Sequence, residues 1–445
     1  MILSSSIVKH RISFVTVPAR MRFMSLITCS LSLTTSLVAE DTWLQAPIHY
    51  QTTAPSDAVA ELRDQLDAES LVAQWDERHG WLPWLLEELQ IPESSQTLVF
   101  SKTSQQIRRI SPSRPRAIYF NDDVYVGWVQ GGDRIEVAAT DPELGSVFYN
   151  VIQQPDSTPQ IRRDRGECLA CHAGGRTRGV PGLLVRSVST MADGQPDFQQ
   201  GTLTTDHTTP FERRFGGWYV TGEHGQMRHS GNCLVAPGEE PDLNTGANLK
   251  RLPDRVNVEQ YLSSGSDIVA LMLLEHQTQM HNHLTRAAFT ARTVLHQQKT
   301  MNRAIGRSES YVNSGTHRRI RAAAEQLLRL LFFCDEAPLT DHVSGSAKFV
   351  TDFSTGIPRD EQGRSLKDLD LQSRLLRYPC SYLVYTDAFQ QMPVTVLRHV
   401  KHRMKQILSE RDQSEKWKHL SSADRRNIRE ILSATHPLFA ATNWK

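Results

Sequence analysis

Two cysteines and a histidine form the motif with the clearest chemistry in this sequence. Cys168, Cys171 and His172 stand in the spacing Cys-x-x-Cys-His, which is the attachment signature of c-type haem. Two thiols three residues apart add to the two vinyl groups of one porphyrin, and the adjacent imidazole then lies under the iron as its proximal ligand. The motif occurs once, so the sequence predicts one haem c, held covalently by Cys168 and Cys171 and ligated by His172.

Other uses of paired cysteines fit this sequence less well. A structural zinc site needs a second ligand pair at similar spacing, and the chain has no second Cys-x-x-Cys. A thioredoxin-like pair would follow a strand and open a helix in a βαβ unit, whereas this motif lies between an arginine-rich stretch and two glycines, a pattern typical of a loop. The other cysteines after residue 39 stand singly and allow at most one disulfide; they are Cys233, Cys334 and Cys380.

The opposite face of the iron decides what such a haem does. Two protein ligands favour electron transfer, whereas an open sixth position allows small-molecule chemistry. The segment Trp218–Asn232 follows the motif by about fifty residues and carries His224, Met227 and His229 between glycines, which let a backbone approach a porphyrin closely. We predict His229 or His224 as the sixth ligand, with Met227 as the alternative; each histidine is otherwise a hydrogen-bonded loop residue.

A second polar group of residues is expected on one side of a helix at Ile268–Thr290. It consists of His276, Met280 and His283 on one face, with Glu275, Gln279 and Asn282 in the adjacent stripe. Residues three and four apart share a helix face, so this polar stripe must meet a haem edge, a distal pocket, a metal or a polar part of the protein. In a haem enzyme, Glu275 and His276 would be the candidate acid/base groups.

Arginines are concentrated around the motif. They are Arg162, Arg163, Arg165, Arg176, Arg178 and Arg186, followed by Arg213 and Arg214. Arginine pairs bidentately with carboxylates, and haem carries two propionates, so we expect one or two of these side chains to bind them. The others form a solvated basic face or a docking patch for an acidic redox partner.

The N-terminus has the pattern of a secretory signal peptide. Arg20 and Arg22 precede the apolar run Phe23–Val38, which ends at the small residue Ala39. We predict residues 1–39 as the signal peptide, cleavage near Ala39 and export to the periplasm; a retained membrane anchor is the alternative. The rest of the chain carries a formal charge of −3, which gives no reason to expect nucleic-acid binding. It has no apolar run long enough for an integral membrane span.

Residue patterning predicts an α+β fold. Short β-branched and aromatic runs at residues 96–155, separated by turn residues, predict an antiparallel β meander of four or five strands in the N-terminal half. We divide the chain into a helix plus β-rich domain at 40–155, a haem c attachment region of loops at 156–236 and a helical domain at 255–445. Helices are expected at 57–68, 81–89, 267–305, 308–333, 366–377, 394–408 and 423–432.

Several runs resemble large secreted monohaem proteins described as "cytochrome c domain-containing" in planctomycete-type bacteria. These runs are Val99–Ser104, Pro115–Asp122, Gly179–Gly182 and Gly216–Gly222, together with the cysteine motif. The resemblance implies haem c, export and redox work, and it transfers a role only to Cys168, Cys171 and His172. Small soluble cytochromes c differ, because they wrap a helical domain of about a hundred residues around the haem.

The most direct function for such a chain is electron transfer in a periplasmic redox chain, with a protein redox partner. The alternative is a peroxidase- or oxidase-like haem enzyme whose sixth iron position is open or labile. The size of the chain suggests this alternative. A domain of ordinary length is enough to carry one haem for electron transfer, and roughly 400 residues exceed that length.

Overall fold

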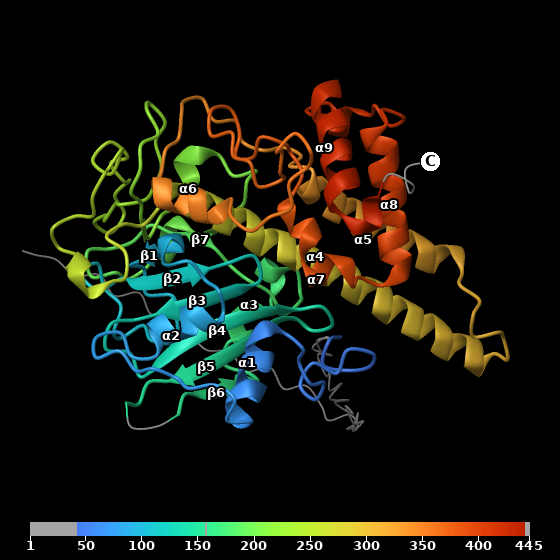
Figure 1. The fold of residues 1–445 in the computed structure, drawn as a ribbon, viewed down its shortest axis with the longest axis horizontal. Coiled ribbons are helices and arrows are strands. Elements are labelled where there is room, and N and C mark those ends of the chain that lie inside the picture. Colours follow the sequence, from blue (N-terminus) through green and yellow to red (C-terminus); the bar gives the residue numbers. More distant parts are fainter. Residues whose placement is uncertain (1–41, 156–157, 441–445) are drawn as a thin grey trace, which may run out of the picture. The chain divides into compact units, whose positions relative to one another are not determined.

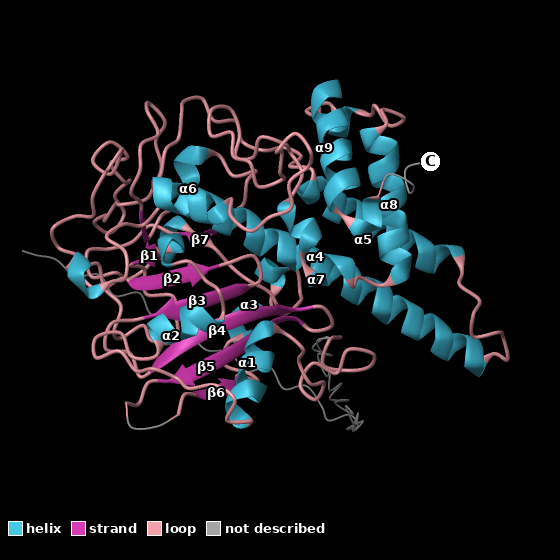
Figure 2. Cartoon of the chain, viewed as in Figure 1, coloured by secondary structure: helices cyan, strands magenta, loops and turns pink. Residues whose placement is uncertain are grey.

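A seven-stranded antiparallel sheet forms the N-terminal half of the fold (Figures 1 and 2). In space its strands are ordered β6-β5-β4-β3-β2-β1-β9. They are β1 (Thr97–Val99), β2 (Arg116–Phe120), β3 (Val124–Trp128), β4 (Arg134–Asp141), β5 (Gly145–Ile152), β6 (Gln160–Arg163) and β9 (Trp218–Tyr219). Strands β1 to β5 each pair with the next strand along the chain, so the predicted meander is confirmed.

The two faces of the sheet have different neighbours because successive side chains of a strand point to opposite faces. On one face, Tyr149 of β5 donates a hydrogen bond of 2.6 Å to Asp57, the N-cap residue of α1 (Ala58–Asp67). On the other face, the adjacent Phe148 lies 5.0 Å from the ring of His172. The cysteine motif and the N-terminal helix therefore lie on opposite faces of the same sheet.

The structure is a computed structural model that describes residues 42–155 and 158–440. The predicted signal peptide lies outside these described residues. Asp41–Lys445 form one compact unit, and the domain boundaries that we placed inside it stay predictions. Among the described residues, no helix combines the length and the apolar character needed to cross a membrane.

Helices dominate the C-terminal half, as expected for an α+β fold (Figure 2). The helices are α1, α2 (Leu82–Glu88), α3 (Leu169–His172), α4 (Ile268–Ala304), α5 (Ser314–Leu331), α6 (Ala347–Phe353), α7 (Asp387–Gln390), α8 (Val394–Leu408) and α9 (Ser422–Thr435), with a small second sheet of β7 (Arg186–Ser187) and β8 (Leu203–Thr204).

The helix predicted at residues 366–377 is wrong. Asp368 and Asp370 accept hydrogen bonds from nearby backbone N–H groups, and such local bonds compete with a helix. Leu369 and Leu376 then pair across the resulting loop. Several leucines of this segment contact the core from a loop. Their spacing matches that of a helix face, although no helix forms here.

Helix α4 organises both halves of the chain. Asp267 caps it by accepting a hydrogen bond from Ala270 N–H, and the helix packs on β5, α5, α7 and α8. Its first half, Ile268–Thr285, is buried on every side. Burial all round is expected of an apolar helix, yet this half contains the predicted polar stripe, so that stripe lies in the protein interior.

Candidate haem attachment site

The cysteine motif lies on one helical turn. Backbone N–H groups of Cys171 and His172 bond to the carbonyl of Cys168 at 3.1 and 2.9 Å, and Ala173 N–H bonds to Leu169. The loop that we predicted here is therefore a short helix, α3, which directly follows β6. Residues at i, i+3 and i+4 share one face of a helix, so the turn presents both thiols and the imidazole together.

The turn is anchored by its apolar side. Leu169 and Ala173 are buried in the core, while Cys171 is exposed and Cys168 is half-buried. Both thiols are free, and the Gln105 amide donates to Cys168 Sγ at 3.4 Å. The arrangement buries the apolar residues of the motif and leaves its reactive groups for another partner.

The imidazole of His172 is held in one orientation. Its Nδ1 lies 2.9 Å from the carbonyl oxygen of Gly182, and since a carbonyl only accepts, Nδ1 must donate. Burial lowers the pKa of His172, which favours the neutral ring, while the Gly182 carbonyl acts in the opposite direction. The proton on Nδ1 leaves Nε2 with its lone pair, and a metal-binding histidine is commonly oriented by this kind of backbone bond.

Helix α4 fixes the loop that holds His172. The side chain of Asn282 accepts from Leu183 N–H and donates to Leu183 carbonyl oxygen, both at 2.8 Å. A Cβ at Gly182 would lie 2.3 Å from Asn282 Oδ1, so the close approach requires glycine there. Gly182 N–H also bonds to the His172 carbonyl at 2.8 Å. Asn282 thus positions the imidazole indirectly. It holds the backbone of Leu183, and the carbonyl of the preceding Gly182 holds His172 Nδ1.

Unpartnered polar atoms lie on the sheet face beside the motif. Arg116 of β2 crosses Gly127, which has no side chain to obstruct it, and pairs with Glu136 of β4 at 2.7 Å. Arg116 Nε, Gln106 Oε1 and Asn150 Oδ1 are buried without a hydrogen-bond partner in the described structure. Arg116 also lowers the pKa of His172, so its guanidinium lies within electrostatic range of the imidazole.

These features fit a covalent haem. Two free thiols and one oriented imidazole share a helical turn, and an unpartnered arginine N–H nearby offers a donor to a carboxylate such as a propionate. No group of three or more His, Cys, Asp or Glu in the described residues could hold a bare metal ion. A covalent haem would use two thiols and one imidazole, and this turn carries all three.

The predicted distal histidines both have hydrogen-bond partners. His224 donates from Nδ1 to the Met227 carbonyl at 2.8 Å, and its Nε2 accepts from Asn248 N–H at 3.0 Å. His229 accepts from Gly231 N–H, and its ring lies 4.7 Å from that of His224. Within the described residues, no hydrogen bond or ring contact joins the side chains of His224, Met227 or His229 to His172, as holds for any two ligands that a haem would separate. The sixth ligand therefore stays a prediction.

The candidate acid/base groups on α4 are interior. Glu275 and His276 have no exposed surface, and neither interacts with the cysteine motif in the described structure. His276 instead bonds to His207 and to Ser381. Glu275 lies 3.4 Å from Arg214, which is buried too. The stripe meets a polar part of the protein, which was one of the four options.

The arginines near the motif divide into two kinds. Arg163 is structural, because it donates to the Tyr50 and Thr53 carbonyls and lies over the Tyr50 ring. Arg214 is buried and bonds to the His207 carbonyl. The exposed arginines are Arg162, Arg165, Arg176, Arg178 and Arg213. Arg186 is half-buried and donates from Nε to Thr202 Oγ1 at 3.0 Å.

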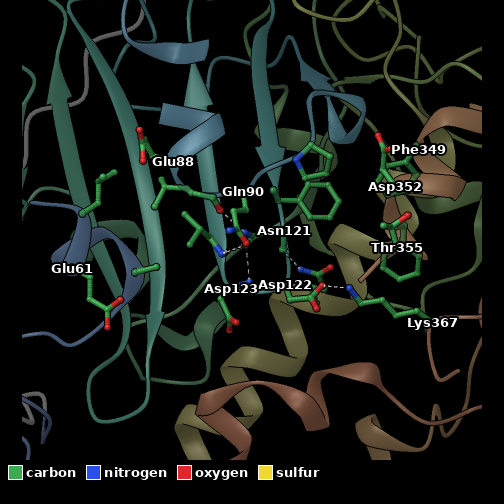
Figure 3. Close-up of a pocket in the computed structure, with 18 of the residues that line it drawn as sticks. Glu61, Glu88, Gln90, Asn121, Asp122, Asp123, Phe349, Asp352, Thr355 and Lys367 are labelled. Carbon is green, nitrogen blue, oxygen red and sulfur yellow. Dashed lines mark hydrogen bonds and ion pairs between the residues drawn. The ribbon is translucent and has the colours of Figure 1, made fainter. Parts of the chain in front are cut away.

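A separate cavity of about 480 Å³ lies at the β2–β3 turn (Figure 3). Its polar lining includes Asp122, which pairs with Lys367 at 2.8 Å, and Asp123, whose pKa is raised to about 6 by burial. No cysteine or histidine lines it. The cavity is therefore not part of the haem attachment site.

Comparisons with known proteins return no matching family model, no similar curated protein and no similar solved structure. The resemblance to secreted monohaem proteins thus rests on the sequence runs alone.

Sequence reasoning missed the residues that support the motif from a distance. Gln105, Arg116, Glu136 and Asn282 come from a loop, two strands and a helix. Asn282 had a signal, since it belongs to the polar stripe of α4. Nothing in the local sequence pointed to Arg116 or Glu136, whose pairing depends on the register between β2, β3 and β4.

Proposed function

We infer that this protein is a c-type cytochrome with one covalent haem, which transfers electrons. The observation that carries the proposal is the helical turn that presents Cys168, Cys171 and His172 on one face, with His172 Nδ1 bound to the Gly182 carbonyl. When bound, the haem would supply a one-electron iron couple. The chain's own residues would hold the haem. The thiols of Cys168 and Cys171 would bond to the porphyrin, and His172 Nε2 would offer its lone pair to the iron.

The cellular setting belongs to the same proposal. Haem c is attached after export, and residues 1–39 have the pattern of a signal peptide. We therefore propose a periplasmic protein that works with a protein redox partner, in the group of secreted monohaem proteins that its sequence resembles. The exposed arginines near the motif are the surface that an acidic partner would contact.

A haem enzyme with an exchangeable sixth iron position is the second candidate. The engagement of both ring nitrogens of His224 favours it, because neither nitrogen is then free to bind iron. A haem whose second face meets no strong protein ligand binds small molecules there.

Absorption spectra test both candidates. We expect the protein, produced in a host that matures c-type haem, to show the reduced bands of haem c. Carbon monoxide should leave these bands unchanged if electron transfer with two protein ligands is correct. A prompt shift of the bands would favour the haem enzyme over electron transfer. A protein that carries no covalent haem would contradict the proposal as a whole.

Replacement of His229 by alanine is expected to open the sixth iron position, so that carbon monoxide shifts the reduced bands. The reason is that electron transfer with two protein ligands needs a second ligand, and His229 is a predicted one. Met227→Leu tests the alternative ligand of the same segment in the same way. Unchanged spectra in His229→Ala would contradict His229 as the sixth ligand, and a shift in Met227→Leu alone would assign that role to Met227.

A further inference from the structure

The connection between α4 and α5 concentrates exposed apolar side chains. Seven large apolar residues are exposed in the described structure, and three of them, Met301, Ile305 and Tyr311, lie within one stretch, residues 301–311. Their exposed fractions are 58%, 55% and 45%. Within this stretch only Asn302 is buried. Exposed apolar side chains that stand singly are ordinary, whereas a group of them marks an interaction site.

The same region is strongly basic. Between residues 299 and 321 the chain carries six lysines and arginines and one acidic residue, Glu309, so its formal charge is +5, whereas the whole chain has +1. All six cationic side chains are exposed; they are Lys299, Arg303, Arg307, Arg318, Arg319 and Arg321. Glu309 pairs with two of them, with Lys299 at 3.0 Å and with Arg303. The region is therefore a local positive patch on a nearly neutral protein.

The cations and the apolar side chains share one end of a helical hairpin, which we call the hairpin tip (residues 299–321). Helices α4 and α5 pack against each other (Figure 1). Met301 and Ile305 are four residues apart, so they lie on one side of α4. Arg318 and Arg319 follow the first residue of α5, Ser314, by four and five residues, a rise of about 6–8 Å. Charges act over about 8 Å at physiological salt, so these arginines act on any surface that the apolar side chains touch.

The loop of the hairpin tip is held from inside. The Asn302 side chain is fully buried and donates to the carbonyl oxygens of Ser308 and Tyr311 at 3.0 and 2.7 Å. Gln298, also buried, donates to Asn302 Oδ1 at 2.9 Å and accepts from Thr316 Oγ1 at 3.1 Å. These bonds fix the loop before it meets a partner, so binding would cost little additional conformational entropy.

A lipid bilayer surface suits both properties of the hairpin tip. Basic segments with exposed apolar side chains lie in the membrane interface, where the apolar groups enter about 5–10 Å and the cations meet anionic headgroups. A nucleic acid would attract the arginines but offers no apolar environment of this kind. A stable protein interface needs about 800 Å² of complementary surface on each partner, whereas the apolar side chains of the tip stand on one exposed loop. The observations therefore favour lipid.

We propose that the hairpin tip binds the surface of an anionic lipid bilayer. Met301, Ile305 and Tyr311 enter the interface between headgroups and acyl chains, and the arginines around them contact lipid phosphates. The cysteine motif is far from this contact, because Asn282, which holds the motif loop, precedes Ile305 by 23 residues, a rise of about 35 Å along α4. The tip would thus hold the protein at a membrane and leave the motif to a redox partner.

Flotation with lipid vesicles tests the proposal on the mature protein. The probes are vesicles of phosphatidylglycerol and phosphatidylcholine in equal parts, and vesicles of phosphatidylcholine alone. We expect binding to the anionic vesicles and weaker binding to the neutral ones. High salt should release the protein, because each lysine or arginine near an anionic surface contributes about fivefold in affinity and salt screens this attraction.

Two double variants of the tip separate the apolar and the electrostatic contributions. Met301→Ser/Ile305→Ser removes apolar area, and Arg318→Gln/Arg319→Gln removes two charges; each should weaken binding to anionic vesicles about tenfold or more. Glu309→Gln removes the acidic residue and should strengthen binding about fivefold. Misfolding would not produce such a gain, so this variant keeps the test decisive if a double variant is unstable.

Matched controls come from other surfaces of the protein. Val72→Ser/Phe198→Ser removes two apolar side chains with exposed fractions of 92% and 63%. Arg251→Gln/Arg255→Gln removes two exposed arginines from the loop that precedes α4, away from the tip at its C-terminal end. Both controls should bind the anionic vesicles as the wild type does.

Three results would overturn the proposal. One is a wild-type protein that does not float with anionic vesicles. Another is equal binding by both tip variants and the wild type, which would assign lipid binding to a different part, such as a retained apolar N-terminus. The third is binding of polyglutamate through the tip without binding to vesicles, which would assign the tip to an acidic protein. The test does not require the haem, so tip-dependent binding by a protein without covalent haem would contradict the cytochrome proposal alone.

Discussion

The Cys168→Ala/Cys171→Ala double variant is expected to contain no covalently bound haem. Each thiol of the helical turn forms one bond to the porphyrin in the proposed function, and both thiols are free in the structure. Haem staining after denaturing electrophoresis should lose its signal completely, and the pyridine haemochrome spectrum should lose the haem c bands. This is the largest effect on function that we expect from any change in the chain.

Cys233→Ala is the matched control for this experiment. Cys233 is partly exposed, as Cys168 is, and its thiol is also free, although it stands outside the motif. Its variant should retain the full haem stain. Equal haem content in the double variant and the wild type would contradict covalent attachment at the motif, and a loss in Cys233→Ala would show that the stain reports general instability.

Asn282→Ala is expected to have the second-largest effect, on both stability and the haem. The change leaves Leu183 N–H and the Leu183 carbonyl without their partners. A buried group left unpaired costs about 1–3 kcal/mol, so loss of both partners should lower the free energy of unfolding by about 2–6 kcal/mol. The Gly182 carbonyl then holds His172 less firmly, and the absorption bands of the haem should broaden or shift.

Asn232→Ala separates these two effects. Asn232 also bonds to both the N–H and the carbonyl of one residue, Val220, at 2.8 Å, but Val220 is not part of the loop that holds His172. We expect a comparable loss of stability in urea unfolding and unchanged haem bands. If both variants change the haem spectrum equally, Asn282 does not position His172 and only stabilises the fold.

Sequence analysis succeeded where the physical signal is local. The long helix was predicted from Asp267 to Ile305, and the structure has its N-cap and C-cap at these two residues. A cap residue and a helical period are properties of a few consecutive residues, so they can be read without knowing the fold. The same holds for the meander, whose strands pair with their neighbours along the chain.

The prediction was weaker for residues whose role depends on contacts with segments far away in the sequence. The polar stripe of α4 was recognised, yet its contact with His207 and Thr205 depends on the path of a segment about seventy residues earlier. The Nε2 atom of His224 accepts a hydrogen bond from Asn248 N–H, which no local pattern indicates. A histidine has the same sequence signature whether its ring binds a metal or a backbone group.

The strand order has a consequence for the sequence of events in folding. Strands β1 to β6 pair with neighbours along the chain, whereas β9 closes on β1 only after the whole segment that carries the motif has passed. Local hairpins form faster than contacts between distant residues, because the entropy of loop closure is smaller. The topology therefore favours an order in which the meander forms early and the β1–β9 contact forms last. In the proposed function, attachment enzymes would meet the two thiols during that interval, and Cys171 stays exposed once the fold has closed.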